Sequence, residues 1–480
     1  MNRSMTGALV VLAMSVAVSC GQSSTDRPAG TVSLLFAGDL MMGRGVASMV
    51  SADPDGLFAD IRSVVQEADF SFANLESPLT DATLVASHPY DLRAASASAA
   101  LVAAVGFDVL GLANNHAGDA GPVGLADSIS TIRAAGMEIV GAGDAGQAYE
   151  PVISEADGVR LAVLAFDVSG LGLPAGPQAG VAQWGDEARA AIGRATAVAH
   201  VVVVGLHGGA AYVDADPVLW RAGREAVASG ADVVWSHGAH VQLPTGVVGD
   251  AIVADGLGNL LFDQAYPGTR QGTLLEVVAG AEGVVAWRTG AADHASGRVR
   301  FSGWDRPEGD AVLIDGEWWN LMPGVAVRPG EKPALEGFPH GDVVATGMGD
   351  VDGDGVDEVV VSFRRPFRRT LLNMAAPERW LDAEGRTAHV GVFEVDDLTS
   401  VWIAGTLRRP VADLSVCDGS MAVAYDTLDD DAIVAVGGWM WNGFGFIGDV
   451  DLEGSAALGC VDVDGDGATE PALTGREFRH

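Results

Sequence analysis

Side chains that bind divalent metals stand at the ends of several expected strands in the first half of the chain. Four of the ten histidines among the 480 residues belong to these segments. The segments are Gly38-Asp39, Asn74-Leu75-Glu76, Asn114-Asn115-His116, His207, His237 with His240, and Gly258-Asn259. Carboxylate, amide and imidazole groups are ligands for hard and borderline metals. The pattern therefore indicates a metal site assembled from several loops at one edge of a sheet.

The chemistry expected of such a set is metal-assisted hydrolysis. A carboxylate bridges or binds two ions, and open positions hold water whose pKa is lowered toward neutrality. A further histidine could then protonate a leaving group. Taken singly, His116 or His207 would as readily be structural residues, so only the ordered set favours a metal site.

The elements that must position these residues alternate between strands and helices. Apolar runs predict buried strands at 31–37, 107–112, 160–166, 201–206 and 232–235. Alanine-rich stretches between them predict helices at 58–68, 96–105, 123–135, 186–199 and 218–229. The alternation predicts an α/β domain whose sheets are flanked by helices.

These motifs, in this order, resemble those of the CapA-type poly-γ-glutamate capsule proteins. The resemblance covers roughly residues 32–278 and rests on Gly38-Asp39, Asn74-Leu-Glu76-Ser-Pro78-Leu79, Leu112-Ala-Asn114-Asn115-His116 with Asp119, His207-Gly-Gly209, His237-Gly-Ala-His240-Val241, and Leu257-Gly-Asn259-Leu-Leu-Phe262-Asp263. The family is related to calcineurin-like metallophosphoesterases. The resemblance implies a four-layer α/β/β/α metallophosphatase-like sandwich.

The resemblance also implies roles for particular residues. One or two divalent ions (Mn, Zn, Fe or Mg) would be held. His116 and Asp119 would be catalytic residues, with His116 either the acid at the leaving group or a contact to phosphate. The implied metal ligands are Asp39, Glu76, Asn115, His207, His237 and His240. The implied substrate contacts are Arg44, Asn74, Asn114 and Asn259.

Three positions depart from the expected motifs. Metallophosphoesterases usually carry a histidine where this chain has Met41, although methionine is common in the capsule family. The run from Gly208 to Ala211 lacks the tryptophan and glutamate that the family often has there. Gly238 replaces a frequent further histidine. These differences put the number of metal ions and part of the substrate contacts in doubt.

After about residue 290 the pattern changes to short strands with two similar acidic loops. In each loop, carboxylates at positions one, three, five and nine surround a glycine, a spacing that can wrap oxygens around Ca²⁺. The loops resemble FG-GAP or VCBS repeats, which implies calcium ligands at Asp350, Asp352, Asp354, Glu358, Asp462, Asp464, Asp466 and Glu470. The alternative is a polar Asp-Gly turn. We expect a small, partly propeller-like β-domain.

The N-terminus has the features of an export signal. Arg3 precedes the apolar stretch Ala8 to Val18, which is too short to span a bilayer. Small residues before Cys20 resemble a lipobox, which implies cleavage and lipid attachment at Cys20. Ala17 stands where a leucine is usual, so plain secretion stays an alternative.

The overall charge and the cysteines narrow the possibilities further. With 64 acidic and 28 basic residues the net charge is −36, which argues against a nucleic-acid partner and favours cation binding. The remaining cysteines, Cys417 and Cys460, form either a disulfide or two buried thiols.

The sequence thus predicts a signal peptide (1–19), a tether (20–30), a CapA-like domain (31–285) and a β-rich domain (286–480). We expect a lipid-anchored protein on the extracytoplasmic face of the membrane. Two hypotheses follow: a metal-dependent hydrolase or transferase of poly-γ-glutamate or another anionic envelope polymer, and a non-catalytic module that binds or guides such a polymer.

Overall fold

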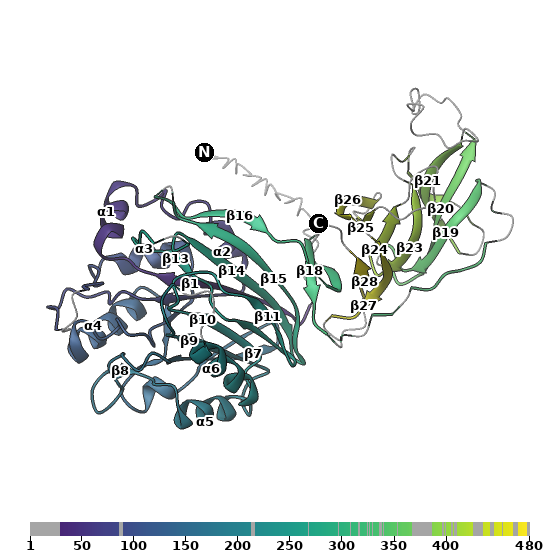
Figure 1. Cartoon of the computed structure of the whole chain (residues 1–480). Helices are drawn as coiled ribbons and strands as arrows, with labels where there is room; N and C mark the ends of the chain where they lie inside the picture. The colour runs from purple at the N-terminus through teal and green to yellow at the C-terminus, as the bar shows by residue number, and fades with distance from the viewer. Residues whose placement is uncertain are drawn as a thin grey trace, which may run out of the picture.

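A computed structural model of the chain shows a mixed α/β part followed by a β-rich part (Figure 1). It describes residues 29–85, 90–212, 217–266, 268–295, 297–307, 309–314, 317–323, 325, 327–328, 330–335, 338, 340–352, 354–366, 386–395, 398, 400–404, 407, 410–425, 435–441, 446–453, 455–463 and 469–477. The predicted signal peptide and Cys20 lie outside these residues. Within them, no helix combines the length and apolarity needed to cross a bilayer.

The first sheet is built around parallel strands whose ends carry the predicted site. Its α/β section consists of β1 (Val32–Leu40), β2 (Phe70–Leu75), β3 (Val109–Gly111), β4 (Glu138–Val140), β13 (Asn259–Leu261), β14 (Gln271–Gly280), β15 (Gly283–Asp293) and β16 (Arg300–Trp304). Strands β1 to β4 and β13 run parallel, whereas β14 joins β1 in the antiparallel direction. Parallel strands bring their carboxyl ends to one edge, where ligand sites of α/β proteins collect.

A second sheet faces the first. It consists of β6 (Val152–Ala156), β7 (Val159–Asp167), β9 (Val201–His207), β10 (Val233–His237), β11 (Thr245–Val248) and β12 (Ala251–Ala254). The strands β7, β9, β10 and β12 are parallel to one another. A short ribbon of β5 (Ala142–Gly143) and β8 (Gly180–Val181) lies apart from both sheets.

The two sheets share one apolar core. Trp235 of β10 is fully buried, and its ring lies 5.5 Å from that of Phe36 and 5.7 Å from that of Phe72 in the first sheet. The rings of Phe36 and Phe72 stack at 4.7 Å. Burying large aromatic side chains contributes about 1.5–3 kcal/mol each. This contact fixes the spacing of the sheets two residues before His237.

Helices pack against both sheets through apolar side chains. Their bounds are α1 (Arg44–Ala52), α2 (Arg62–Glu67), α3 (Ser98–Val105), α4 (Gly121–Ala134), η1 (Gln147–Tyr149), α5 (Asp186–Ala195) and α6 (Pro217–Ala228). Buried residues of α1 to α4 belong to the core of the first sheet, and those of α5 and α6 to a separate core with the second. Along β7, Val163 points to the shared core and Leu164 to the helices, as strand alternation requires.

The first sheet does not end at residue 285, where the sequence predicts a domain boundary. β14 and β15 form a long hairpin that runs through this position. β15 also pairs with β18 (Glu317–Leu321), which continues the sheet through β17 (Ala311–Ile314), β28 (Glu470–Glu477) and β27 (Ser455–Val461). The first sheet therefore runs without interruption from the α/β part into the β-rich part.

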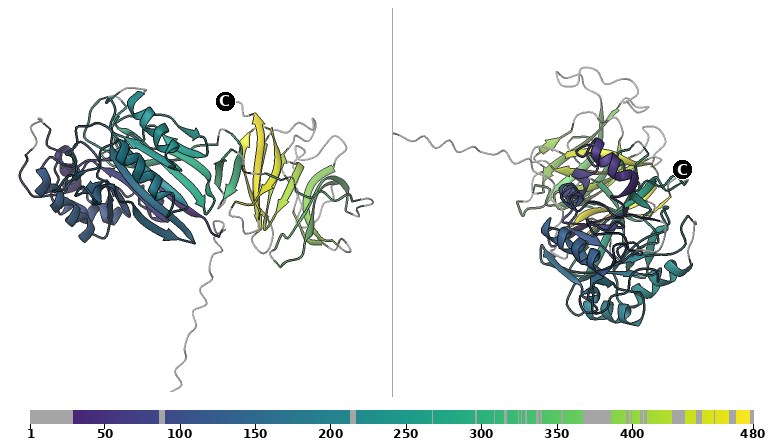
Figure 2. Two further views of the ribbon diagram at one scale, coloured as in Figure 1. Left: turned by 90° about the horizontal axis from the view of Figure 1, so that it is seen from below. Right: turned by 90° about the vertical axis from the view of Figure 1, so that its left-hand side faces the viewer.

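Beyond this extension lie two antiparallel four-stranded sheets, seen beside the α/β part in Figure 1 and Figure 2. One contains β19 (Asp342–Gly349), β20 (Glu358–Pro366), β21 (Arg386–Glu394) and β22 (Ser400–Ile403). The other contains β23 (Val411–Cys417), β24 (Ser420–Tyr425), β25 (Ala435–Trp441) and β26 (Phe446–Glu453). Buried side chains from both sheets form a common apolar cluster.

Candidate metal centre

Strand register places predicted site residues in two rows. In the first sheet, Asp39 of β1 lies opposite Asn74 of β2 and Asn259 of β13. In the second sheet, His207 of β9 lies opposite His237 of β10. Because β1 and β10 contact each other, the two rows meet between the sheets.

Asp39 stands at the centre of three imidazoles. Its side chain is fully buried. Asp39 Oδ1 lies 3.7 Å from His207 Nδ1 and 3.8 Å from His237 Nδ1. Its other oxygen, Oδ2, lies 3.2 Å from His240 Nδ1. Residues spread over two hundred positions thus converge on one carboxylate.

The side chains form two overlapping clusters of potential metal ligands. Asp39, His207 and His237 place one ligand atom each within 4.8 Å of one another. Asp39, Glu76 and His240 do the same. A carboxylate shared by two adjacent ligand sets is what a binuclear centre requires.

Three of the asparagines predicted as substrate contacts lie beneath the ligands, where their amides orient the site. Asn74 Nδ2 donates to Asp39 Oδ1 at 2.7 Å, and Asn114 Nδ2 donates to Asn74 Oδ1 at 3.1 Å. Asn259 Oδ1 lies 3.1 Å from His240 Nδ1. All three are fully buried. Their amides are therefore positioned to fix ligand geometry rather than to meet a solute from the solvent.

Asn115, predicted as a metal ligand, contacts the cluster through His207. Its Oδ1 lies 2.8 Å from His207 Nε2. Because an amide oxygen only accepts, we assign the ring proton of His207 to Nε2. This tautomer leaves a lone pair on Nδ1, the nitrogen that faces Asp39.

His116 and Asp119 form a dyad at the side of the centre. His116 Nδ1 lies 3.2 Å from Asp119 Oδ2, so the buried carboxylate fixes the orientation of the ring. The other nitrogen, Nε2, lies 3.9 Å from Glu76 Oε1. A ring held in this way presents Nε2 to the centre, which is the geometry expected of a proton donor.

Burial and neighbouring charges set the protonation of the ligands. Burial lowers the pKa of His207 to about 4 and that of His237 to about 3, although the charge of Asp39 opposes the shift. Both rings are therefore neutral near pH 7 and can offer lone pairs. For Asp39 burial favours the neutral acid, but the hydrogen bond to His240 and the nearby imidazoles hold its pKa below the usual range.

The second cluster binds protons more tightly. Burial raises the pKa of Glu76 to about 8, with the charge of His240 opposing and that of Asp39 adding to the shift. Burial alone would lower the pKa of His240, but Glu76 and Asp39 raise it to about 9. Two carboxylates this close favour a positive partner, which is a proton here and would be a cation in a loaded site.

Two buried atoms test whether this chain fits a divalent cation. Glu76 Oε2 and His237 Nε2 are buried and have no hydrogen-bond partner among the described residues. Leaving such atoms unsatisfied costs about 1–3 kcal/mol each. A cation bound at the site would offset the cost of the unsatisfied Oε2 of Glu76. The mixture of carboxylate oxygen and imidazole nitrogen suits Mn²⁺, Zn²⁺ or Fe²⁺. The residues present therefore fit such an ion.

Close backbone approach and left-handed residues build the floor of the site. A Cβ at Gly38 would lie 1.9 Å from the carbonyl oxygen of Gly258. His240 has φ of 62° and Arg44 has φ of 49°, conformations that are unfavourable for residues other than glycine. Such backbone strain concentrates at functional sites in proteins.

Exposed side chains next to the centre, called here its entrance, include one predicted and two unpredicted residues. Arg44, expected as a substrate contact, forms an ion pair with Asp263 at 3.0 Å. The ring of Tyr212 lies 5.9 Å from that of His240 and stacks on Tyr266 at 4.5 Å. Tyr212 directly follows the run from Gly208 to Ala211, but nothing in the sequence places Tyr266 beside it.

The first acidic loop of the β-rich part brings together three of its four predicted calcium ligands. Asp350, Asp352 and Glu358 each place an oxygen within 4.8 Å of the others. The amide of Asp354 donates to Asp350 Oδ1 at 3.1 Å. The buried Glu358 accepts a hydrogen bond from the amide of Val351 at 2.8 Å.

The second acidic loop is described only in part. Asp464 and Asp466 lie outside the described residues, while Asp462 and Glu470 lie within them. Glu470 accepts a hydrogen bond from the amide of Val463 at 3.2 Å, the same contact that Glu358 makes in the first loop.

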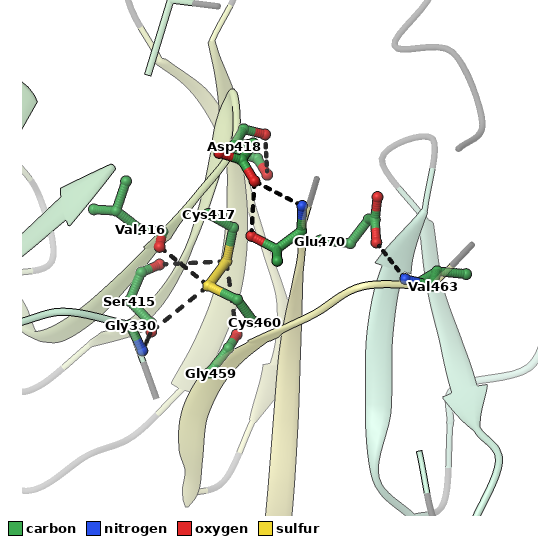
Figure 3. Close-up of a disulfide and its surroundings, with 11 residues drawn as sticks. Gly330, Ser415, Val416, Cys417, Asp418, Gly459, Cys460, Val463 and Glu470 are labelled. Atoms are coloured by element: carbon green, nitrogen blue, oxygen red, sulfur yellow. Dashed lines mark hydrogen bonds between the residues drawn. A yellow bond between two sulfur atoms is a disulfide. The ribbon is translucent and has the colours of Figure 1, made fainter. Parts of the chain in front are cut away.

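A single turn at Asp418 and Gly419 touches both loops. Figure 3 shows Asp418 beside the disulfide that precedes this turn. The amide of Gly419 donates to the carbonyl of Asp350 at 3.0 Å, and Asp418 Oδ2 accepts from the amide of Thr469 at 2.8 Å. The preceding residue, Cys417, is joined to Cys460 by a disulfide across 43 residues of sequence. The disulfide therefore connects β23 to β27, directly beside the two loops.

Comparison with known proteins identifies the α/β part. Residues 33–264 match the family described as bacterial capsule synthesis protein PGA_cap. This range contains all six segments from Gly38-Asp39 to Gly258-Asn259, so the matched part includes the whole candidate metal centre.

Two curated relatives align with the same half of the chain. The PGA biosynthesis protein CapA of Bacillus subtilis (strain 168) is 32% identical over 266 residues, which cover 51% of this chain and 67% of that protein. The capsule biosynthesis protein CapA of Bacillus anthracis is 29% identical over 259 residues, covering 51% and 63%. The chain thus spans about two thirds of the length of each relative.

Among solved structures, Pyrococcus horikoshii acylaminoacyl peptidase overlaps 40% of this chain and 32% of its own, with a TM-score of 0.16 and 7% identity. A similarity this low does not indicate a common fold. The family match and the CapA relatives, by contrast, fall on the strands and loops that carry the ligands. This chain therefore belongs to the bacterial capsule synthesis protein PGA_cap family.

Proposed function

We propose that this protein is a metal-dependent hydrolase or transferase that acts on poly-γ-glutamate or another anionic capsule polymer. The observation that carries the proposal is the pair of ligand clusters that share the buried carboxylate of Asp39. The names of the Bacillus relatives, which refer to PGA and capsule biosynthesis, suggest the polymer. The proposed architecture is the four-layer α/β/β/α metallophosphatase-like sandwich.

The residues that would hold divalent cations are Asp39, Glu76, His207, His237 and His240. Bound cations supply Lewis acidity and lower the pKa of water. Asn115 fixes the ring of His207 through its contact with Nε2, and Asn259 contacts His240. The arrangement keeps the donor atoms in place before a substrate arrives.

His116 is the proposed proton donor. Asp119 accepts from Nδ1 and thereby holds Nε2 toward the centre. A protonated Nε2 can give its proton to the leaving atom as the bond breaks, and Asp119 stabilises the positive charge of the ring before that transfer. Because His116 is only slightly exposed, bulk water has little access to this proton.

The decisive test is metal content together with activity. Purified wild type should contain a transition metal by mass spectrometry, and the double variant His237→Ala, His240→Ala should lose it. His200→Ala, an exposed histidine outside the centre, is the control. Metal-stimulated cleavage of a phosphoester or of γ-glutamyl polymer should disappear in His116→Ala. If wild type neither binds metal nor cleaves either substrate, the proposal is wrong.

One observation favours a second function, polymer binding without catalysis. The run from Gly208 to Ala211 offers no tryptophan or glutamate side chain near the centre. If polymer binding survives both chelation and His116→Ala, while no cleavage is detected, the non-catalytic function is the better description.

We further propose that the chain is exported and lipid-anchored at Cys20. The disulfide between Cys417 and Cys460 supports this proposal, because disulfides persist in oxidising compartments. A Cys20→Ser variant should move from the membrane fraction to the soluble fraction. Retention of this variant in the membrane fraction would contradict the anchor.

Calcium binding by the acidic loops is also a proposal. The oxygen cluster of Asp350, Asp352 and Glu358 supports it in the first loop. The matching hydrogen bond of Glu470 supports an equivalent geometry in the second loop. A structural Ca²⁺ at each loop would neutralise carboxylates that otherwise repel one another.

A further inference from the structure

Two tyrosines at the entrance of the metal centre have fixed backbones and exposed rings. Tyr212 is 39% exposed and Tyr266 is 53% exposed, yet the two rings stack at 4.5 Å and 24°. Neither phenol hydroxyl forms a hydrogen bond with another described residue. An exposed aromatic surface with free donors is available to a ligand.

The backbone of each tyrosine is tied to residues around His240. The amide of Tyr212 donates to the carbonyl of Ala239 at 2.9 Å. Thr269 Oγ1 donates to the carbonyl of Tyr266 at 2.7 Å, and the carbonyl of Thr269 accepts from Asn259 Nδ2 at 2.8 Å. Since Asn259 also contacts His240, the stacked pair is held at a constant position relative to the ligands.

The backbone of Tyr212 is also strained. Its φ is 67°, and it is one of five residues other than glycine with positive φ in the described part of the chain. Three of the five, Arg44, Tyr212 and His240, belong to this site. A left-handed tyrosine costs about 1–2 kcal/mol, so its persistence at the entrance calls for a function.

We propose that Tyr212 and Tyr266 form a platform that recognises the γ-glutamyl chain and positions it over the metal centre. This inference rests on the proposed function and specifies how the same site selects its substrate. The planar amides of the polymer pack on the aromatic faces, and the phenol hydroxyls donate to its carboxylates.

Charge explains why neutral donors suit this substrate. The chain has a net charge of −36, so a polyanion is repelled at long range. Arg44, the cation at the entrance, is paired with Asp263. Hydroxyl donors bind carboxylates, and ring faces bind amides, without a row of cationic side chains. They select for the distance between these groups along the polymer rather than for its charge.

The test is binding of a γ-linked glutamate hexamer to the manganese-loaded full chain, measured by isothermal titration calorimetry. Tyr212→Ala and Tyr266→Ala should each weaken binding about tenfold. Tyr212→Phe and Tyr266→Phe keep the stack and should weaken binding about threefold. The control is Trp220→Ala, which removes an aromatic residue on α6 that is 53% exposed, as Tyr266 is.

Two further measurements separate this inference from the metal centre. Metal content should be unchanged in all four tyrosine variants. The preference of wild type for the γ-linked over the α-linked hexamer should shrink in the alanine variants. The platform is refuted if wild type fails to bind the γ-linked hexamer, or if the alanine variants bind it as wild type does. The metal content of wild type then shows independently whether the protein has a metal centre.

Discussion

Asp39 is the residue on which both halves of the centre depend, because its two oxygens face different histidines. Asp39→Asn should lower metal content by more than tenfold, since it removes the shared charge and turns one acceptor into a donor. Mass spectrometry of the purified protein measures this. The matched control is Asp167→Asn.

Asp167 is a demanding control because it occupies the register position of His207 on the neighbouring strand β7. It is equally buried, but its oxygens accept hydrogen bonds from Ser169, Gly172 and Gln183. Asp167→Asn should therefore keep the metal even where it lowers the melting temperature. Equal metal loss in both variants would show that folding, not ligation, accounts for the effect.

Metal affinity should rise with pH. The pKa of Glu76 is raised by burial and that of His240 by the neighbouring carboxylates, so this coupled pair holds at least one proton at neutral pH. A cation must displace bound protons, so its apparent affinity rises by about tenfold for each unit of increase in pH and each proton displaced. Titrations with Mn²⁺ at pH 6, 7 and 8 should show this slope, and Glu76→Gln should reduce it. A flat profile would contradict the assignment.

The sequence predicted most of this site at the residue level, because each ligand follows an apolar run. Asp39, Glu76, His207, His237 and His240 are the residues that the structure brings together. The sequence could not distinguish a metal ligand from an amide that orients a ligand, because the distinction depends on interatomic distances that only the packed structure defines. Hydrogen bonding of Asn115 to His207, and the stacking of Tyr212 on Tyr266, arise from contacts between distant loops.

At the scale of elements, β1 can place Asp39 only because Gly38 has no side chain where the backbone before β13 approaches. Gly38→Ala would bring its Cβ to 1.9 Å from the carbonyl oxygen of Gly258. We expect a loss of about 1–3 kcal/mol in the free energy of unfolding, because backbone atoms must shift. The control is Gly246→Ala on β11, where a Cβ meets nothing within 4 Å. Urea denaturation compares the two, and equal stability would contradict the prediction.

Most elements of the α/β part could be predicted from apolar periodicity. The runs expected at 160–166 and 201–206 correspond to β7 and β9, and the stretches at 96–105 and 218–229 overlap α3 and α6. β13, which inserts beside β1, could not be predicted, because three residues carry too little pattern. The position of the hairpin of β14 and β15 could not be predicted either, because the length of a strand does not indicate which edge of a sheet the strand joins.

At the scale of the whole molecule, Ca²⁺ should stabilise the β-rich part. A ligand at a hundred times its dissociation constant adds about 2.7 kcal/mol to the free energy of unfolding. EGTA should therefore lower the melting temperature, and Glu358→Gln should remove most of the effect. Asp357→Asn, in the same loop but outside the oxygen cluster, should leave it intact. Melting curves insensitive to calcium would contradict the proposal.

The disulfide should stabilise the same part of the chain. It closes a loop of 43 residues, for which loss of the cross-link costs about 4 kcal/mol. The double variant Cys417→Ser, Cys460→Ser should unfold at lower urea concentration, while metal content of the centre stays unchanged. Addition of a reductant to wild type should reproduce the effect. No difference between the oxidised and reduced forms would show that packing alone holds β23 to β27.

The arrangement of the β-rich part was the least predictable feature. Short strands and repeated acidic loops indicated its class, but strand partners depend on contacts over long sequence distances. β17 near residue 312 pairs with β28 near residue 472, and this pairing joins the part to the first sheet. No local pattern in either strand specifies that partner.

The pairing of β17 with β28 has a consequence for biosynthesis. During translation, β17 emerges from the ribosome long before the strand that completes its edge. Until β28 arrives, the open edge is a template for wrong partners, in the same chain or in neighbouring nascent chains. Chaperones that shield unpaired strands should therefore matter more for the yield of this protein than for that of its α/β half alone.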